Sequence, residues 1–412
     1  MDYRATIVLY LELLLALTML QREGLVNTRP RQIVAIGMVS LAFVLRYCCL
    51  TYETLDYRDW LVTWLSALRE AGPWKGLGQE IWSCNYNVPY IYFLALIAKS
   101  GVRDLLLIKL FSILFDIILA WTVMRLVGLL TQSPVRRLIA FVGVLWLPTV
   151  YLNGALWGQC DVIYSTFAVL GLYLALSGKP RWSVAAVAVS VSFKLQGIFL
   201  LPMYLVLLIA GKIKFRHLFI FPAVYVATLL PAVFAGRNFW ELLTLYYNNT
   251  SSIGEGLNYN SSSMYALFDF SKLSPSAASS IGIMLALFLC AGLFIAALVR
   301  YKNLSDRALL GIAVLFCVGV PFFLPHMHDR YFFMADVLTF ALAVTVPALS
   351  AAAVCVSFGS FLGYYAYLKM RFLVSMRWGA AAMVVALLLT AGFVIFSLTD
   401  AKRVLTNRED LV

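Results

Sequence analysis

Charged residues are scarce in this chain. They make up only 13% of its 412 residues, whereas hydrophobic residues make up 62%. The mean hydropathy is accordingly high, at +0.87. A soluble domain cannot bury so large a share of apolar side chains, so the composition excludes the soluble globular class. The sequence therefore predicts a polytopic membrane protein.

Several other common features are also missing. The apolar runs lack the alternation of a membrane β-barrel, and backbone in hydrocarbon must be paired internally, so we expect helices. The seven cysteines show no metal-binding spacing and are expected to be packing residues. No basic region precedes the first apolar run, Thr6 to Leu20, and no clear small-residue cleavage site follows it. We expect this run to be a retained helix rather than a signal peptide.

The apolar runs predict the number of membrane spans. They cover residues 5–20, 33–50, 104–130, 137–156, 161–178, 182–211, 218–235, 281–299, 307–324, 331–368 and 378–398. A span needs about 20 apolar residues, so the runs at 182–211 and 331–368 can hold two helices each. We therefore expect an all-α helix bundle of about 12 to 13 spans, forming one domain over residues 1–412.

The loops between the runs are of two kinds. The basic loops contain Arg22, Arg29, Arg31, Arg136, Arg137, Lys179, Arg181, Lys212, Lys214, Arg216, His217, Arg300, Lys302 and Arg307. The acidic, aromatic or mixed loops are 51–103, 157–161, 236–280 and 325–330. Because basic loops stay in the cytoplasm, the second kind is expected on the outer face. Lys369, Arg371 and Arg377 do not fit, so their segment lies along the interface or the helix count is off by one there.

The net charge of the chain is +12. In a soluble protein such a charge would indicate nucleic acid. In a membrane protein the positive-inside rule accounts for it, so we expect membrane lipids and no nucleic acid as partners.

The first outer loop, 51–103, contains two predicted interfacial helices. Residues 59–70 form one of them, with four apolar side chains on one face: Trp60, Trp64, Leu65 and Leu68. Residues 85–99 are apolar, aromatic and short, which suits a helix lying in the membrane interface. If this second helix crossed the membrane, the basic loop at Arg136 would move to the outer face.

The second large outer loop, 236–280, is rich in Tyr, Asn and Ser. Such side chains can hydrogen-bond sugar hydroxyls and stack on sugar rings, but an ordinary polar connector has a similar composition. Loops of this length are uncommon unless they are functional or disordered. The sequence leaves both interpretations open.

Three carboxylates open the first outer loop: Glu53, Asp56 and Asp59. In sugar transfer the acceptor hydroxyl must lose a proton, and a carboxylate within hydrogen-bond reach can take it. Asp56 and Asp59 are three residues apart and would share a helix face, where they could also bind a divalent cation. A solvated loop at a membrane boundary would contain the same residue types.

Two further polar segments interrupt the apolar runs. Gln159 and Asp161 lie in WGQCD, where Asp161 could also be a plain helix cap. Lys194 and Gln196 lie in SFKLQ, and a lysine near membrane depth is a candidate functional residue unless it snorkels to the surface. At the outer end of its helix, Lys194 could pair with a phosphate.

The segment PHMHDRY places His326, His328 and Arg330 between two apolar runs. His-x-His with Asp329 could bind a metal, but a further ligand at suitable spacing is missing, so we expect no metal site. An anion pocket fits better, because Arg330 and the histidines could neutralise a departing lipid phosphate. A plain polar hairpin is the alternative. Asp336, within the next apolar run, is expected to support the same site.

Taken together, these segments resemble a known family. LDYRDWLVTW, WGQCDVIY, FKLQG and LPHMHDRYFF, in that order, are similar to segments of the GT-C glycosyltransferases. These are multi-spanning enzymes that take sugars from polyprenyl-phosphate donors. The chain most resembles bacterial proteins related to the GPI-anchor mannosyltransferase II, and more faintly the dolichyl-phosphate-glucose-dependent glucosyltransferases. The resemblance covers most of the chain, and the His-x-His-acid-base segment is its most specific part.

The resemblance also implies roles for individual residues. A first-loop Asp followed by an aromatic residue is the family's catalytic base, which implies Asp56, with Asp59 as the competing choice. Basic residues of the later segments are implied to lie near the donor phosphate: Lys194, His326, His328 and Arg330. The family's reaction is an inverting displacement, without a strict metal requirement in many members.

The sequence therefore predicts a cell-membrane glycosyltransferase. It would transfer a hexose, mannose or glucose, from a polyprenyl-phosphate donor to a glycan or lipid-linked acceptor on the outer face. Gln159, Asp161 and Gln196 would bind or orient the sugar, and no cofactor is expected, although a divalent cation is possible.

Two alternatives belong to other classes. A transporter or flippase of a lipid-linked glycan would carry inverted repeats and a site at the midplane, whereas the polar residues here gather at one face. A non-catalytic helix scaffold would not retain charges within the membrane.

Overall fold

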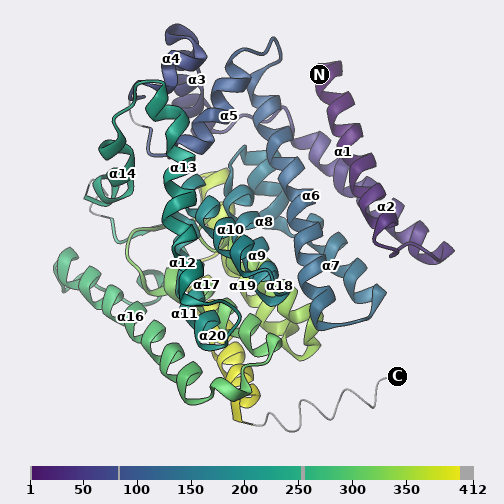
Figure 1. Ribbon diagram of the computed structural model, residues 1–412, viewed down its shortest axis with the longest axis vertical. Coiled ribbons are helices and arrows are strands. Elements are labelled where there is room, and N and C mark those ends of the chain that lie inside the picture. Colours follow the sequence, from purple (N-terminus) through teal and green to yellow (C-terminus); the bar gives the residue numbers. More distant parts are fainter. Residues whose placement is uncertain (1, 82–83, 252–255, 400–412) are drawn as a thin grey trace.

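The computed structural model describes residues 2–81, 84–251 and 256–399 of the chain. The chain is 79% helical, and the described residues form a bundle with two very short strands (Figure 1). The expectation of an all-α polytopic membrane protein is therefore confirmed.

The helices of the first half are α1 (Tyr3–Arg22), α2 (Arg29–Cys49), η1 (Tyr57–Leu61), α3 (Val62–Ala71), α4 (Pro73–Leu77), α5 (Val88–Ala98), α6 (Asp104–Leu130), α7 (Pro134–Trp146), α8 (Pro148–Tyr151), η2 (Leu152–Trp157), α9 (Asp161–Leu176), α10 (Pro180–Phe193) and η3 (Leu195–Leu200). Those of the second half are α11 (Leu201–Ile209), α12 (Phe215–Leu218), α13 (Ile220–Phe234), α14 (Phe239–Ser251), α15 (Met264–Leu267), α16 (Pro275–Val299), η4 (Tyr301–Asn303), α17 (Asp306–Phe323), α18 (Phe333–Thr345), η5 (Pro347–Leu349), α19 (Ser350–Lys369) and α20 (Met376–Thr399). The strands are β1 (Asn258–Tyr259) and β2 (Met327–His328).

Eight helices in the described ranges are long and apolar enough to cross a membrane, and one bent pair can supply a ninth span. Both long apolar runs hold two helices as expected: 182–211 contains α10 and α11, and 331–368 contains α18 and α19. Several apolar helices are short, including α9 and α18. The expected count of about 12 to 13 spans is reached only if these short helices also cross.

The bent pair is formed by α7 and the segment Pro148–Trp157, which meet at 45°. A residue before proline is pushed out of the helical region, and Leu147 accordingly has a ψ of 124°. Arg46 of α2 holds the bend by donating to the carbonyl of Leu145 at 3.0 Å, while its guanidinium pairs with Asp116 of α6 at 2.9 Å. The bend directs η2 toward the end of the bundle where α9 begins.

The first loop forms short helices at one end of the molecule, where α3, α4 and α5 lie together (Figure 1). Trp64, Leu65 and Leu68 are buried on one face of α3, as expected, but Trp60 is 40% exposed. The reason is that residues 57–61 form a π-helix, whose wider turn rotates Trp60 away from the face of Trp64.

The described part of the second loop contains regular elements. It contains α14, β1 and α15, and β1 pairs in parallel with β2, matching Tyr259 to His328. This strand pair ties the second loop to the PHMHDRY segment. Part of the Tyr-, Asn- and Ser-rich stretch, residues 252–255, lies outside the described residues.

The basic residues that did not fit the loop pattern lie beside the turn between α19 and α20. Both of these helices are long enough to span, and Tyr367 near the end of α19 contacts Asp56. The turn therefore lies at the same end as the first loop. Lys369, Arg371 and Arg377 are an exception to the expected alternation.

Candidate functional site

The carboxylate of Asp56 is held by three neutral donors. The indole Nε1 of Trp157 donates to it at 2.8 Å and the hydroxyl of Tyr367 at 2.6 Å, and the side-chain amide of Gln159 also donates. Asp56 lies just before η1, so these donors come from distant parts of the chain. Among the described residues these neutral donors hold the carboxylate, and no cation forms an ion pair with it.

Trp157 and Tyr367 form a platform beside Asp56. Their rings stack with centroids 4.0 Å apart and planes 12° apart. The backbone carbonyl of Trp157 also accepts a hydrogen bond from Thr54 at 3.0 Å, which ties η2 to the start of the first loop. The stack therefore fixes both donors relative to the segment that carries Asp56.

Asp161 is the second carboxylate of the site and lies between two cations. Lys194 contacts its Oδ1 at 2.5 Å, and Arg330 lies 3.4 Å from its Oδ2. The side-chain amide of Asn153 donates to Oδ2 at 2.8 Å. Asp161 is completely buried and Lys194 only 7% exposed, so this ion pair is held away from bulk solvent.

Aromatic contacts connect the two carboxylates. Arg330 lies over the ring of Trp157 at 5.4 Å, and Lys194 lies over the ring of Tyr86 at 5.1 Å. The hydroxyl of Tyr86 donates to Gln159 at 3.0 Å, and Gln159 in turn donates to Asp56. Asp56, Asp161, Lys194 and Arg330 therefore belong to one continuous cluster, which we name the acid–base cluster.

Short helices position this cluster. α9 begins at Asp161, and α10 ends at Phe193, one residue before Lys194. With 16 and 14 residues, these helices are only about 24 and 21 Å long, shorter than a bilayer core of about 30 Å. Each helix therefore ends at the cluster, and the polar side chains of the cluster lie where a helix of full bilayer length would continue.

His328 and Asp329 lie beside Arg330. Burial lowers the pKa of His328 to about 4, and the positive charges of Arg330 and Lys194 act in the same direction. The ring stacks on Tyr259 of β1, with centroids 4.7 Å apart, and is neutral at neutral pH. Burial raises the pKa of Asp329 to about 7, although Arg330 opposes the shift.

The other expected site residues have different surroundings. Gln196 is buried and interacts with Tyr331, which follows Arg330. His326 is turned away, because its Nδ1 donates to the carbonyl of Gly256 at 2.7 Å. Asp59 is exposed to solvent on η1. Asp336 is buried one turn inside α18, where Thr149 donates to it, so it supports α8 rather than the cluster.

Three members of the site have no counterpart in the sequence analysis: Tyr86, Asn153 and Tyr367. Asn153 donates to Asp161 and to the hydroxyl of Tyr364 at 2.9 Å. Each lies within an ordinary apolar or aromatic stretch, where a single Asn or Tyr carries no motif. Only the spacing of Asn153, eight residues before Asp161, could have indicated it.

No group of three or more His, Cys, Asp or Glu residues that could hold a metal ion is found in the described part of the chain. Neither models of known protein families nor characterised proteins match this sequence. The fold and the cluster define the class as an all-α polytopic membrane protein with paired acidic and basic side chains at the ends of short helices.

Proposed function

We propose that this protein is an integral membrane glycosyltransferase. It transfers a hexose from a polyprenyl-phosphate donor to a hydroxyl of a glycan or lipid-linked acceptor, on the extracytoplasmic side of the cell membrane. The observation that carries this proposal is that Asp56, Lys194 and Arg330, far apart in sequence, belong to one cluster at the ends of short helices.

Asp56 is the best candidate for the base among the nearby carboxylates. Asp161 is neutralised by Lys194 and Arg330, and Glu53 is paired with Arg58 and Arg103. A carboxylate paired with a cation is a weak base, because losing its charge would break the pair. Asp56 is held by neutral groups, so it can take a proton without leaving a cation unpaired.

Lys194 and Arg330 are the candidates for the donor phosphate. Arg330 has five N–H donors and uses only part of them on Asp161 and Asp329. Its planar guanidinium matches the geometry of a phosphate, while Lys194 adds a compact charge beside it. His328 is neutral and His326 faces Gly256, so the two histidines contribute less to charge neutralisation than the sequence predicts.

The chemistry follows from these positions. Asp56 takes the proton of the acceptor hydroxyl as that oxygen forms a bond to the anomeric carbon of the sugar. The bond from this carbon to the phosphate oxygen breaks, and the electron pair leaves with the lipid phosphate. Lys194 and Arg330 stabilise the charge that develops on the phosphate. Attack from the face opposite the phosphate inverts the anomeric configuration.

The test is to incubate the purified protein with a panel of polyprenyl-phosphate hexoses and a glycolipid extract as acceptor, and to measure release of lipid phosphate. Asp56→Asn is expected to lower the rate at least about 100-fold, the usual contribution of a general base. Asp59→Asn, at an exposed position three residues further along the same loop, is the matched control and should retain the wild-type rate.

Two results would contradict different parts of the proposal. A full rate in the Asp56→Asn variant, with its thermal stability unchanged, would contradict Asp56 as the base and move that role to Asp59 or Glu53. Movement of a lipid-linked glycan across a vesicle membrane without release of lipid phosphate, which is what a flippase would give, would contradict the transferase itself.

A further inference from the structure

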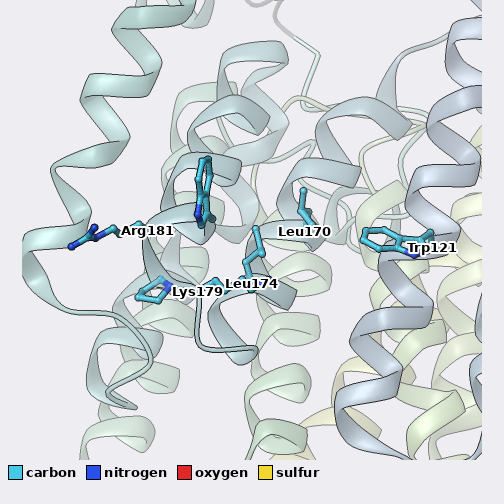
Figure 2. A pocket seen from close by; sticks show the side chains of 7 residues that line it. Trp121, Leu170, Leu174, Lys179 and Arg181 are labelled. Atoms are coloured by element: carbon cyan, nitrogen blue, oxygen red, sulfur yellow. The ribbon is translucent and has the colours of Figure 1, made fainter. Parts of the chain in front are cut away.

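A second feature of the molecule lies far from the acid–base cluster. A groove of about 720 Å³ runs between α6, α9 and the start of α10. Its lining residues are Trp121, Leu170, Leu174, Lys179, Pro180, Arg181 and Trp182. Figure 2 shows the ring of Trp121 on one side, with Leu170 and Leu174 between it and the turn that carries Lys179. The lining is apolar except at this turn.

The groove lies at the opposite end of α9 from the cluster. α9 begins at Asp161 in the cluster and ends at Leu176. After the turn, α10 begins at Pro180 and runs back toward the cluster. α9 contains 16 residues, so the two ends are separated by about 24 Å. The groove therefore cannot belong to the site around Asp56.

The turn between α9 and α10 holds a lysine at the end of the groove. Gly178 adopts a φ of +78°, a conformation that favours glycine, and this allows a tight reversal. The backbone N–H of Lys179 donates to the carbonyl of Leu174 at 2.8 Å, which fixes the turn against α9. The side chain of Lys179 is exposed beside the apolar wall.

Several positive charges surround this turn. The guanidinium of Arg181 extends away from Trp121 (Figure 2), and Arg181, Lys214 and Arg216 all act electrostatically on His217. Glu23, which accepts from the indole of Trp121 at 3.0 Å, is already paired with Arg125 and Arg137. The charge next to the groove is therefore positive.

Tryptophan marks the membrane interface at this end. Trp182, which follows Arg181 in the groove lining, is 70% exposed. Trp side chains prefer the level of the lipid head groups, with the apolar ring toward the acyl chains. An apolar groove that begins at this level and carries a lysine at its mouth matches a phospholipid in both polarity and depth.

We propose that this groove binds one anionic phospholipid. One acyl chain lies along Leu170, Leu174 and Trp121, and the phosphate meets Lys179, with Arg181 adding to the attractive field. The volume falls within the range of ordinary ligand pockets. A lipid fits better than a protein helix, because the groove ends at a charged turn.

The experiment uses the purified full-length chain in nanodiscs that contain equal amounts of phosphatidylglycerol and phosphatidylcholine. After release into detergent, native mass spectrometry counts the lipids that remain bound. Wild-type protein is expected to retain one phosphatidylglycerol in preference to phosphatidylcholine. In Lys179→Gln with Arg181→Gln, retention should fall about fivefold for each charge removed.

A second variant tests the apolar wall without changing charge. Leu174→Trp fills the groove and should also abolish retention, while Trp182 remains in place. The control is Arg300→Gln with Lys302→Gln, which removes two exposed charges from a different basic loop.

The outcomes are distinct. Loss of retention in the groove variants but not in the control supports the proposal. Equal loss in the control variant would overturn it, because binding would then depend only on the overall charge. Equal retention of the two lipids, or displacement of the bound lipid by inorganic phosphate, would also overturn it.

Discussion

The ring of Tyr367 stacks on the indole of Trp157, 4.0 Å away, and both side chains donate to the same carboxylate, that of Asp56. The stack joins η2 to the end of α19, two segments about 210 residues apart. The carboxylate of Asp56 is thereby oriented by side chains of η2 and α19, which lie far from it in the sequence.

Tyr367→Phe is expected to lower kcat while leaving the fold intact. The variant keeps the ring stack and loses the hydroxyl, which donates to the carboxylate of Asp56 and accepts from the backbone N–H of Asp56 at 3.2 Å. Without these two contacts the carboxylate loses its fixed orientation, and misplacing a catalytic group by about 1 Å can cost about 100-fold, so kcat should fall about 10- to 100-fold. KM for the donor should change little, because the hydroxyl faces the base. Steady-state release of lipid phosphate measures both constants.

Tyr365→Phe is the matched control on the same helix. Its hydroxyl accepts from Arg371 at 3.2 Å, at an exposed position away from Asp56. Wild-type kcat is expected for this variant. An equal fall in kcat for both variants would show that the loss comes from α19 as a whole rather than from the bond to Asp56.

The helix bundle was predictable because a long apolar run in lipid can pair its backbone N–H and C=O groups within the segment only by forming a helix. Asp161 and Lys194 could be singled out because each lies in a short polar segment between apolar runs. The buried pair of Arg46 and Asp116, inside such runs, was not singled out. The contact between Asp161 and Lys194 was not predictable, because it depends on where α9 begins and α10 ends.

Other parts of the site could not be read from the sequence. The rotation of Trp60 arises from a π-turn, which has no sequence signature here. The orientation of His326 depends on Gly256, 70 residues away, and its backbone takes a φ of 62° that the residue type does not require. The contact of Tyr367 with Asp56 could not be predicted because the chain contains 22 tyrosines and nothing in the sequence distinguishes this one.

Asp161→Asn is expected to destabilise the protein more than Lys194→Gln. Asp161 contacts both Lys194 and Arg330, so removing its charge leaves the buried Lys194 and the half-buried Arg330 without the carboxylate that they share. Breaking a buried ion pair costs about 3–5 kcal/mol, and repulsion between the cations adds to this cost. Removing Lys194 leaves Asp161 paired with Arg330 and should cost less. Thermal unfolding in detergent measures the difference.

The double variant completes this comparison. Asp161→Asn with Lys194→Gln removes one charge of each sign and leaves Arg330 next to Asp329. Its Tm is expected to lie above that of Asp161→Asn. A double variant as unstable as the sum of the two single losses would show that the two side chains do not interact energetically.

His328 and Asp329 are expected to give opposite dependences of stability on pH. The pKa of His328 is lowered from 6.5 to about 4, so between these values the unfolded chain binds a proton that the folded chain does not. Stability from this residue therefore falls as the pH falls from 6.5 to 4. The pKa of Asp329 is raised from 3.8 to about 7, so here the folded chain binds the extra proton and stability falls as the pH rises.

Single variants separate the two effects. His328→Gln leaves the contribution of Asp329 and should make the protein relatively more stable at pH 5 than at pH 7.5. Asp329→Asn leaves the contribution of His328 and should do the reverse, with a slope of at most about 1.4 kcal/mol per pH unit. Tm values at pH 5, 6 and 7.5 measure both slopes. Identical pH profiles for the two variants would contradict this assignment.

Gly363→Ala is expected to disturb the site through the backbone. A Cβ at this position of α19 would lie 2.5 Å from the carbonyl oxygen of Asp329 and 2.9 Å from that of Asn260. Backbone atoms cannot swing aside as a flexible side chain can, so α19 must move away from the segment that carries Arg330. Such overpacking costs about 1–3 kcal/mol. The rate of lipid-phosphate release should fall further than stability alone explains, because Tyr367 lies one turn along the same helix.

Gly392→Ala, with nothing within 4 Å of its added Cβ, is the control and should keep both the rate and the Tm of the wild type. If Gly363→Ala also behaves like the wild type, α19 does not set the position of Arg330.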